Sequence, residues 1–325
     1  MNKFKWGIIG CGYIAKKFAE ACRSAEGMEI TAVASRSVQK AELFAGAVGA
    51  KQYFGSYEEM LKNCSLDAVY IATVNSEHAA NADLCLDNNL PVLCEKPFVM
   101  NLKDFDCLTA KAKQKNLAIM EAMWSNFLPA NVEIKNLVNE GAIGKVSLAY
   151  IDFCTIFHNE RKELKGRIFN PKLGGGLIFD IGVYNLHCAF SLFGTEYSDI
   201  AICGIKGETG VDINASIAFT YPNGVLVNTV TNCRSKGPFS LRICGDKGYI
   251  LEEGYNGAQE FSICLNDEEP KIIKKPFITN GFEYQIIEFA HIVNSGKLES
   301  EYMPWSTSRK VCEVMEKAYK LITED

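Results

Sequence analysis

Three small residues near the amino terminus have the spacing that a dinucleotide requires. Gly10, Gly12 and Ala15 form G-x-G-x-x-A between an apolar run of strand type and a helical stretch. Gly10 permits a tight turn, Gly12 lets the backbone approach a pyrophosphate, and Ala15 lets the helix pack closely on the strand. The N–H groups at the helix start, around Tyr13 and Ile14, attract negative charge. The alternative is an ordinary structural turn, but the strand–turn–helix context favours a dinucleotide site.

The end of the second apolar run indicates which dinucleotide would bind. Ser35, Arg36 and Ser37 follow it, where NAD-specific domains usually carry Asp or Glu for the ribose hydroxyls. A guanidinium suits a 2′-phosphate instead, and charge-assisted bonds contribute about 1.5–3 kcal/mol each. These residues predict NADP as the preferred cofactor by roughly tenfold to hundredfold, with NAD as the weaker alternative. The competing interpretation is that Arg36 is solvated and Ser37 caps the next helix.

Two further strand ends carry polar groups suited to chemistry. Thr73, Asn75 and His78 follow the fourth predicted strand, and Glu95 to Pro97 follow the fifth. Parallel sheets bind ligands beyond the carboxyl ends of their strands. A proline at such an end favours a fixed turn, of which a cis peptide bond is one form, and this would hold Lys96 rigidly. The alternatives are a surface lysine in a salt bridge and a histidine that caps a helix.

The elements that position these residues divide the chain into two domains. In residues 1–122, strand and helix signals alternate, which predicts a doubly wound parallel sheet of the Rossmann type. Residues 123–325 contain mainly strand signals joined by hairpin turns, with four helices, which predicts an α+β domain with a large, mostly antiparallel open sheet. The expected strands of the first domain are 4–9, 28–34, 51–54, 67–72, 91–94 and 117–121, and its helices are 13–24, 38–47, 57–64, 77–88 and 102–115. The expected strands of the second are 146–157, 200–206, 213–221, 225–232, 240–245, 249–252 and 261–265, and its helices are 130–139, 183–192, 282–295 and 306–323.

Composition limits the partners and the compartment. A net charge of −5 over 325 residues, without a basic block, argues against nucleic acid. The sequence predicts neither a secretory signal nor an apolar run long enough to cross a bilayer. Thirteen scattered cysteines, several in apolar strands (Cys94, Cys154, Cys203 and Cys244), resemble small buried hydrophobic residues in a reducing cytoplasm. The cysteines and four histidines lack zinc-site spacing, so we expect no metal.

Several motifs together resemble the Gfo/Idh/MocA family of NAD(P)-dependent oxidoreductases. They are G-C-G-Y-I-A, C-E-K-P-F (Cys94–Phe98), E-A-M-W (Glu121–Trp124) and R-I-F-N-P-K-L-G-G-G-L-I-F-D-I-G-V-Y (Arg167–Tyr184). Their order and distances cover nearly the whole chain. Each piece alone is weak, but the combination is specific.

One departure narrows the resemblance. Much of the family continues D-x-G-x-H-x-x-D, whereas here Tyr184 takes the histidine position and His187 the final aspartate position. This variant is similar to the dimeric dihydrodiol dehydrogenases and the NADP-dependent D-xylose dehydrogenases. The resemblance implies Tyr184 as general acid/base, Lys96 as its electrostatic partner, and His78, Glu95 and Trp124 near the cofactor. Packing of Tyr184 in an apolar helix is the alternative.

The surrounding residues suggest a substrate pocket. Arg167 and Asp180 are candidates for holding substrate hydroxyls, beside Lys96 and Trp124. The run Gly174–Gly176 lacks the P-loop pattern and is interpreted as a sharp turn that delivers Asp180 and Tyr184. Aromatic residues that could line an apolar wall, or else belong to the core, are Trp124, Phe127, Phe153, Phe157 and Phe169.

Two functions follow as hypotheses. The first is an NADP-preferring dehydrogenase or reductase that acts on a hydroxyl-bearing carbon of a sugar, polyol or cyclic vicinal diol, without a metal. The second is a non-catalytic, dinucleotide-bound regulator of the same fold, against which the presence of both Lys96 and Tyr184 argues. The open sheet of the second domain predicts a homodimer, with a tetramer as the alternative.

Overall fold

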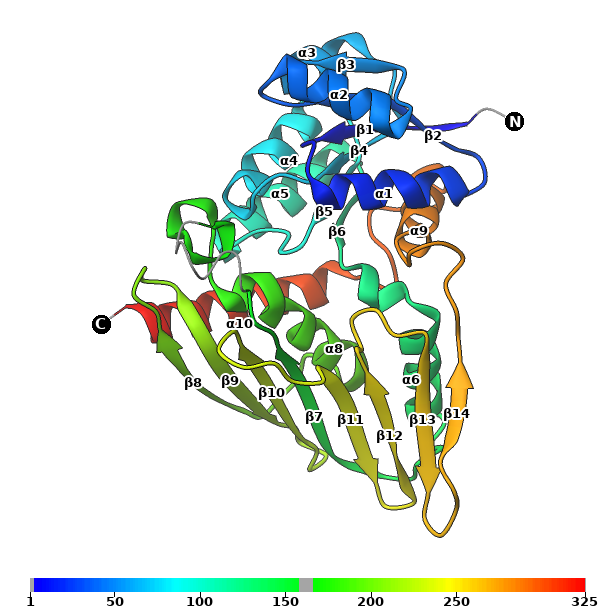
Figure 1. Cartoon of the computed structure of the whole chain (residues 1–325), viewed down its shortest axis with the longest axis vertical. Helices are drawn as coiled ribbons and strands as arrows, with labels where there is room; N and C mark the ends of the chain where they lie inside the picture. Colours follow the sequence, from blue (N-terminus) through cyan, green and yellow to red (C-terminus); the bar gives the residue numbers. More distant parts are fainter. Residues whose placement is uncertain (1–2, 158–165, 325) are drawn as a thin grey trace. The chain divides into compact units, whose positions relative to one another are not determined.

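The computed structural model describes residues 3–157 and 166–324, which form two compact units (Figure 1). The first contains Met1–Trp124 and Ile278–Ser308, and the second contains Ser125–Phe277 and Arg309–Asp325. The change of pattern along the sequence predicts that everything after residue 122 belongs to the second domain. The structure instead returns Ile278–Ser308 to the first unit, because the buried Phe289 packs on Trp6 with ring centroids 5.7 Å apart.

The first unit is built on a parallel sheet of six strands in the order β3-β2-β1-β4-β5-β6. The strands are β1 (Phe4–Ile9), β2 (Met28–Ala34), β3 (Gln52–Phe54), β4 (Ala68–Ile71), β5 (Val92–Glu95) and β6 (Ile119–Ala122). The reversal of strand order on either side of β1 is that of a doubly wound sheet. The predicted Rossmann architecture is therefore confirmed.

Helices alternate with these strands, and polar residues mark several of their ends. The elements are α1 (Tyr13–Ser24), α2 (Val38–Val48), α3 (Tyr57–Asn63), η1 (Asn75–Glu77), α4 (His78–Asp87), α5 (Leu102–Lys115), η2 (Trp124–Phe127) and α9 (Glu283–Asn294). Ser37, Ser56 and Asn101 accept a backbone N–H bond at the N-termini of α2, α3 and α5. Gly49 and Asn116 end α2 and α5 in the left-handed conformation.

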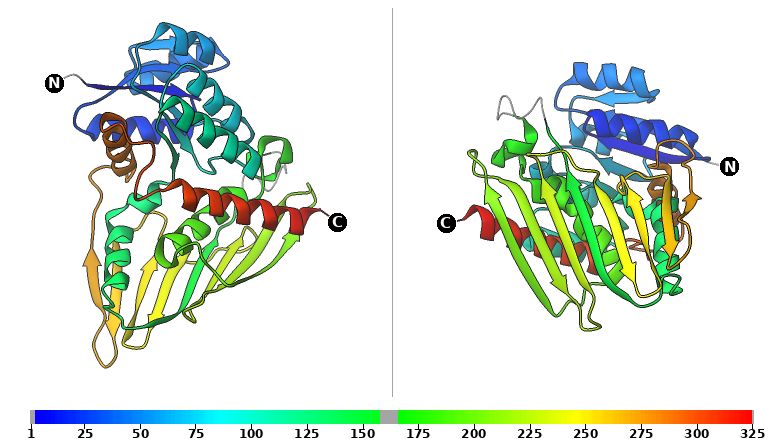
Figure 2. Two further views of the ribbon diagram at one scale, coloured as in Figure 1. Left: turned by 180° about the vertical axis from the view of Figure 1, so that it is seen from behind. Right: turned by 60° about the horizontal axis from the view of Figure 1, so that its bottom comes forward.

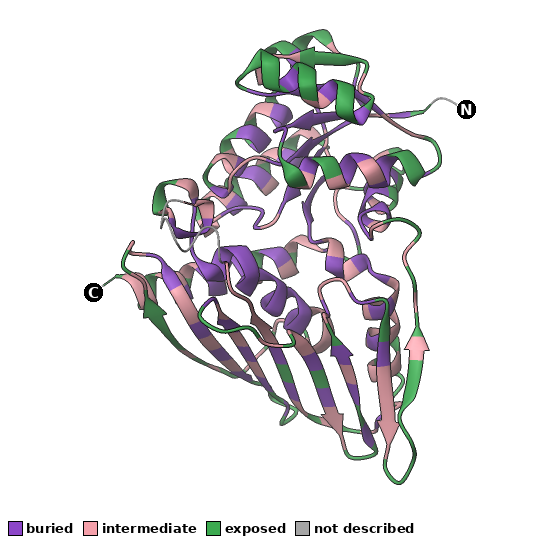
Figure 3. Cartoon of the chain, in the orientation of Figure 1, coloured by how far each residue is buried: buried purple, intermediate pink, exposed green. Residues whose placement is uncertain are grey.

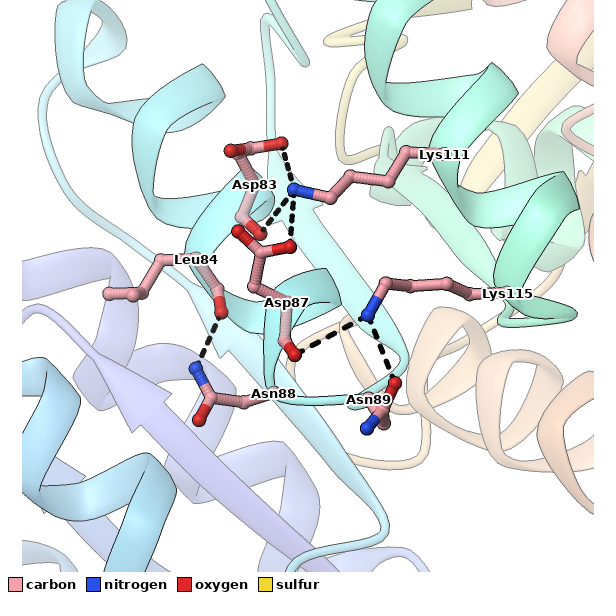
Figure 4. Close-up of polar contacts among 7 residues, drawn as sticks. All are labelled: Asp83, Leu84, Asp87, Asn88, Asn89, Lys111 and Lys115. Carbon is pink, nitrogen blue, oxygen red and sulfur yellow. Dashed lines mark hydrogen bonds and ion pairs between the residues drawn. The ribbon is translucent and has the colours of Figure 1, made fainter.

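The helices α4 and α5 are joined at their surface by a polar network (Figure 4). The Lys111 ammonium contacts the carboxylates of Asp83 and Asp87 at 2.6 and 2.7 Å, and Lys115 donates to the side chain of Asn89 at 3.0 Å. Because both aspartates are solvent-exposed, salt screens these pairs and they contribute little to stability. The network therefore serves mainly to align two adjacent surface helices.

The second unit is built on a sheet of eight strands in the order β14-β13-β12-β11-β7-β10-β9-β8. The strands are β7 (Val146–Cys154), β8 (Asp199–Lys206), β9 (Asp212–Thr220), β10 (Leu226–Asn232), β11 (Ser240–Gly245), β12 (Gly248–Glu253), β13 (Glu260–Leu265) and β14 (Lys271–Lys274). Among the described strands of this sheet, only β7 and β10 pair in parallel, so the predicted mostly antiparallel sheet is confirmed. The short edge strand β14 was not predicted.

Helices cover one face of this sheet (Figure 2). They are α6 (Pro129–Asn139), α8 (Val183–Phe193) and the part of α10 (Trp305–Thr323) that follows Ser308. Buried residues alternate with less buried ones along the strands (Figure 3), for example Val227, Thr229 and Thr231 on β10. The other face carries partly exposed apolar residues such as Tyr150 and Leu226, as expected for an open sheet.

Two expectations from composition need correction. By length and composition alone, the stretch Pro171–Phe193 is long and apolar enough to cross a membrane, although no such run was expected from the sequence; 83% of its apolar window is buried, as in a core helix. All thirteen cysteines are free, but only Cys94 of the four strand cysteines is buried, and Cys203 is exposed. Cys203 lies on β8, the last strand in the order of the described sheet.

Candidate active site

The glycine motif forms the turn from β1 into α1. Gly10 has φ +97°, and a Cβ there would lie 2.6 Å from the carbonyl oxygen of Ala72, so both the turn and the neighbouring strand end require glycine. Gly12 precedes α1, and a Cβ there would have no atom within 4 Å. Ala15 is fully buried, and the first turn of α1 has no acidic residue. Open space at Gly12 and an uncapped helix start fit a pyrophosphate.

The adenosine-end residues follow β2 as expected. Ser35 is buried and Arg36 is exposed. The Ser37 hydroxyl accepts the Lys40 N–H at 3.3 Å, so the capping role considered for Ser37 is present. Burial raises the pKa of Tyr57 while the Arg36 charge lowers it, which places the guanidinium near that ring. The helix cap is made by Ser37 and not by Arg36. The exposed Arg36 side chain therefore remains the candidate for binding a 2′-phosphate.

The polar groups after β4 are tied to the loop after β5 through one histidine. His78 is 1% exposed, with Nδ1 2.8 Å from the carbonyl oxygen of Pro97 and Nε2 3.3 Å from that of Thr73. Asn81 donates to the Thr73 hydroxyl at 3.2 Å, and Asn75 is buried beside them. Thus His78 fixes two strand ends relative to each other.

The segment after β5 turns through a cis peptide bond between Lys96 and Pro97. Burial raises the pKa of Glu95 to about 7, against the lowering effects of the Tyr70 hydroxyl and of the Lys96 charge. Glu121 holds the segment from β6: its Oε1 accepts the Phe98 N–H at 3.0 Å, and its Oε2 accepts the Ser308 hydroxyl at 2.8 Å. The backbone around the half-buried Lys96 is therefore constrained on both sides.

Trp124 ends the first unit in a stack with Phe282, with ring centroids 5.0 Å apart and planes at 27°. The stack leaves Trp124 partly exposed. An aromatic ring held in this way is suited to contact a flat ligand group.

In the second unit, Tyr184 is the second residue of α8 and is 8% exposed. The ring of Phe153 lies 5.9 Å from it. The five residues that precede α8 form a π-helix, η5 (Ile178–Gly182), which carries Asp180. π-helical turns are rare and are frequent at functional sites.

The predicted polar pair also lies in this unit. An Arg167 guanidinium nitrogen contacts Oδ1 of Asp180 at 2.7 Å, and the Asp180 side chain is 8% exposed against 37% for Arg167. The glycine run before η5 is a sharp turn, as predicted: Gly174 and Gly176 have φ +75° and +124°. A Cβ on Gly175 would lie within 2.6 Å of a carbonyl oxygen of Ile168.

The aromatic wall divides into two groups. Phe127 and Phe169 are buried core residues. Phe153 and Phe157 are partly buried and pack against a cluster that includes Phe169 and Leu177. Only the partly exposed aromatics, including Trp124, can present a surface to a ligand.

Three further residues, which the sequence patterns do not mark as candidates, support the candidate site. Tyr70, Glu121 and Asp212 make buried hydrogen bonds to the segments that carry Lys96 or Tyr184. Glu121 stands in the motif E-A-M-W, which was a usable signal, whereas nothing local marked Tyr70 or Asp212. Among the described residues, 3–157 and 166–324, no group of three or more His, Cys, Asp or Glu residues could hold a metal ion. His158 lies outside the described residues.

The parallel sheet and the glycine turn define a dinucleotide-binding domain, and comparison with known proteins identifies the family. Residues 4–123 match the oxidoreductase family with an NAD-binding Rossmann fold, and residues 131–251 match the GFO/IDH/MocA C-terminal domain. The chain belongs to the Gfo/Idh/MocA family, which confirms the resemblance.

Relatives that are named for an enzymatic activity align with almost the full length of this chain. The chain is 30% identical to scyllo-inositol 2-dehydrogenase (NADP(+)) of Bacillus subtilis over 97% of this chain and 96% of the relative. It is 30% identical to trans-1,2-dihydrobenzene-1,2-diol dehydrogenase of Xenopus laevis, with the same coverage. It is 31% identical to D-xylose 1-dehydrogenase (NADP(+)) of Hypocrea jecorina, over 97% of this chain and 91% of the relative.

Solved structures share the fold. The aldose–aldose oxidoreductase of Caulobacter crescentus has a TM-score of 0.88 at 23% identity, covering 98% of this chain and 97% of the other. The 3-ketoreductase KijD10 of Actinomadura kijaniata, solved with NADP, has a TM-score of 0.86 at 23% identity, covering 98% of each chain.

Proposed function

We propose that this oxidoreductase prefers NADP and transfers a hydride between the nicotinamide and a hydroxyl-bearing carbon of a sugar, polyol or cyclic vicinal diol. The observation that carries the proposal is full-length identity of 30–31% to enzymes named for a polyol, a diol and a sugar. Two of those three names specify NADP(+). The common chemistry is oxidation of a secondary alcohol or hemiacetal carbon.

The residues present fit the cofactor. The turn at Gly10 and Gly12 would receive the pyrophosphate, and Arg36, with Ser35 and Ser37, would bind the 2′-phosphate. The loops that contain Thr73, Asn75, His78, Glu95, Lys96 and Trp124 would flank the nicotinamide end. When bound there, NADPH would supply the hydride for carbonyl reduction, and NADP(+) would accept it from an alcohol.

We assign the proton transfer to Tyr184, with Lys96 as its electrostatic partner. A tyrosine with a pKa near ~10 is already protonated at neutral pH and can donate to a carbonyl during reduction. Alcohol oxidation needs the phenolate, and a pKa lower by three units corresponds to about 4 kcal/mol. One ammonium at ~4 Å supplies that order of magnitude at an effective dielectric of ~20. The family motif supports this pairing of a lysine with a tyrosine.

Substrate hydroxyls would be bound by Arg167 and Asp180. Their ion pair holds the Asp180 carboxylate in one orientation, from which it can accept a hydrogen bond from a substrate hydroxyl. Phe157 and Trp124 would contact the apolar part of a ring substrate. A buried, oriented carboxylate next to a cation suits a polyol better than a simple aliphatic alcohol.

Two measurements on the pure protein test the proposal. Fluorescence titration should show tighter binding of NADPH than of NADH. Turnover should then be assayed with scyllo-inositol, D-xylose and trans-1,2-dihydrobenzene-1,2-diol, and Tyr184→Phe should lower kcat by about 10²-fold or more while NADPH binding persists. Tight NADPH binding without turnover of any probe would favour the regulator, and near-normal turnover of the variant would return Tyr184 to a packing role.

We also propose that two or four copies assemble through the uncovered face of the second sheet, in the cytoplasm. The Arg242 guanidinium lies over the Tyr150 ring at 4.6 Å, beside a hollow of about 280 Å³ that Asn228 and Leu251 help to line. An aromatic–arginine pair on an apolar sheet face is typical of interface centres. Sedimentation of the wild type and of Tyr150→Glu gives the test: a monomeric wild type would overturn it.

A further inference from the structure

Asp212 links β9 to the start of the helical segment that carries Tyr184. It is the first residue of β9 and is fully buried. Its Oδ2 accepts the N–H of Ile178 at 2.9 Å. Ile178 begins η5, which runs directly into α8, so the hydrogen bond lies at the origin of the segment that contains Asp180 and Tyr184.

The other carboxylate oxygen faces the glycine turn. A Cβ on Gly176 would lie 2.4 Å from Oδ1 of Asp212 and 3.0 Å from the Tyr319 ring. Tyr319 also packs on Phe179 of η5, with ring centroids 4.8 Å apart. The glycine turn, the Asp212 carboxyl group and η5 are thus in close contact, and a side chain at Gly176 would clash with Asp212.

The energetics indicate a specific task for this carboxyl group. Burial raises the pKa of Asp212 to about 7, although the N–H groups of Ile178 and Leu177 lower it. A buried carboxyl group costs free energy that an apolar residue would not. The start of η5 has no side-chain cap of its own, so Asp212 supplies an acceptor that the local sequence lacks. This acceptor is best explained by a need to fix the helix start.

We propose that Asp212 is a positioning residue, which holds residues 176–178 and thereby sets the location of the Tyr184 hydroxyl. The inference rests on the proposed catalytic function of Tyr184. A displacement of about 1 Å in a reacting group can cost roughly 10²-fold in rate. Loss of the Asp212 acceptor should therefore lower kcat more than it changes the affinity for NADPH.

The first experiment compares Asp212→Ala with Asp212→Asn. The alanine variant removes the acceptor for the Ile178 N–H, and we expect kcat to fall roughly tenfold to hundredfold with NADPH binding unchanged. The asparagine variant keeps a carbonyl oxygen at the same place and should retain turnover close to wild type. Equal loss in both variants, or none in the alanine variant, would overturn the proposal.

A double-mutant cycle separates this inference from the proposed function. If Asp212 acts through Tyr184, the alanine substitution should cause little further loss in a Tyr184→Phe background. The same fold-loss in both backgrounds would indicate general structural damage instead. Near-normal turnover of Tyr184→Phe alone would reject the proposed function, whereas a defective Tyr184→Phe with a normal Asp212→Ala would reject only this inference.

Amide hydrogen exchange provides a readout that needs no substrate. In folded Asp212→Ala, the amides of residues 178–182 should lose protection, while those of β7 and β10 keep theirs. Asp212→Asn should keep protection in both places. Unchanged protection of 178–182 in the alanine variant would show that the hydrogen bond does not hold the segment.

Discussion

The hydroxyl of Tyr70 donates a hydrogen bond of 2.5 Å to Oε1 of Glu95, and both side chains are buried. Tyr70 itself stacks on Phe18 of α1, with ring centroids 3.8 Å apart and planes at 9°. The helix of the glycine turn and the residue before Lys96 are therefore connected through a single tyrosine. Both ends of the proposed cofactor site in this unit share one rigid support.

The buried Glu95 should make stability depend on pH. Burial raises the pKa of Glu95 to about 7, from an ordinary value near ~4.3. Between these two pH values the folded protein keeps the Glu95 proton, whereas the unfolded protein has lost it. The stabilisation is fully present below pH ~4.3 and is lost as pH rises through about 7, on the order of 3 kcal/mol in all. Urea unfolding of wild type and Glu95→Gln from pH 4.5 to 8 should show this difference between the two curves.

Tyr70→Phe is the matched control for that experiment. It removes a hydrogen bond that lowers the pKa of Glu95, so the decline in stability should extend to higher pH. Parallel pH curves for wild type and Glu95→Gln would contradict the prediction.

Arg36→Ala should abolish the preference for NADP. The variant loses the guanidinium that would bind the 2′-phosphate, so NADPH should bind roughly tenfold to hundredfold more weakly while NADH affinity stays unchanged. Fluorescence titration measures both affinities. Lys111→Ala removes a charge of the same sign from the ion pairs with Asp83 and Asp87, and it should leave the ratio unchanged. An unaltered ratio in Arg36→Ala would mean that Arg36 is a solvated residue.

Lys96→Met should move the pH profile of alcohol oxidation. Without the ammonium, the Tyr184 phenolate is less stabilised, and the ascending limb of the pH profile of kcat should shift upward by roughly one to three pH units. Lys96→Arg keeps the charge and should shift the limb much less. The profiles are measured as NADPH formation from pH 6 to 10.5. A low rate with an unshifted limb would assign Lys96 to binding only.

Local patterns predicted the elements because their ends carry clear signals. The bounds of β1, β2, α1 and α5 match the predictions, since apolar runs meet Gly, Ser or Asn at their ends. The strand β14 was missed because it has four residues with a lysine at each end. The helix at 283–294 was predicted, but its packing on Trp6 depends on a contact across most of the chain, which periodicity does not contain.

The same distinction applies to the candidate site. Local motifs contain the main candidate residues, Gly10, Gly12, Lys96 and Tyr184. The spacing of residues within these motifs indicates the role proposed for each one. Their supports come from distant strands: Tyr70 lies 25 residues from Glu95, and Asp212 lies 34 residues from Ile178. Such residues leave no periodic pattern in the sequence, because each acts through a single hydrogen bond to a residue far away along the chain.

The two motif glycines should respond differently to alanine. Gly10 has φ +97° and its Cβ would lie 2.6 Å from the Ala72 carbonyl oxygen, so Gly10→Ala should destabilise the fold by more than ~1 kcal/mol. At Gly12 the backbone is extended and a Cβ meets no atom within 4 Å, so Gly12→Ala should unfold like wild type. It should nonetheless weaken NADPH binding, because the methyl group occupies the space where the pyrophosphate approaches. Urea unfolding of both variants measures their stability, and fluorescence titration measures their affinity for NADPH. Normal NADPH affinity in Gly12→Ala would show that no phosphate approaches this turn.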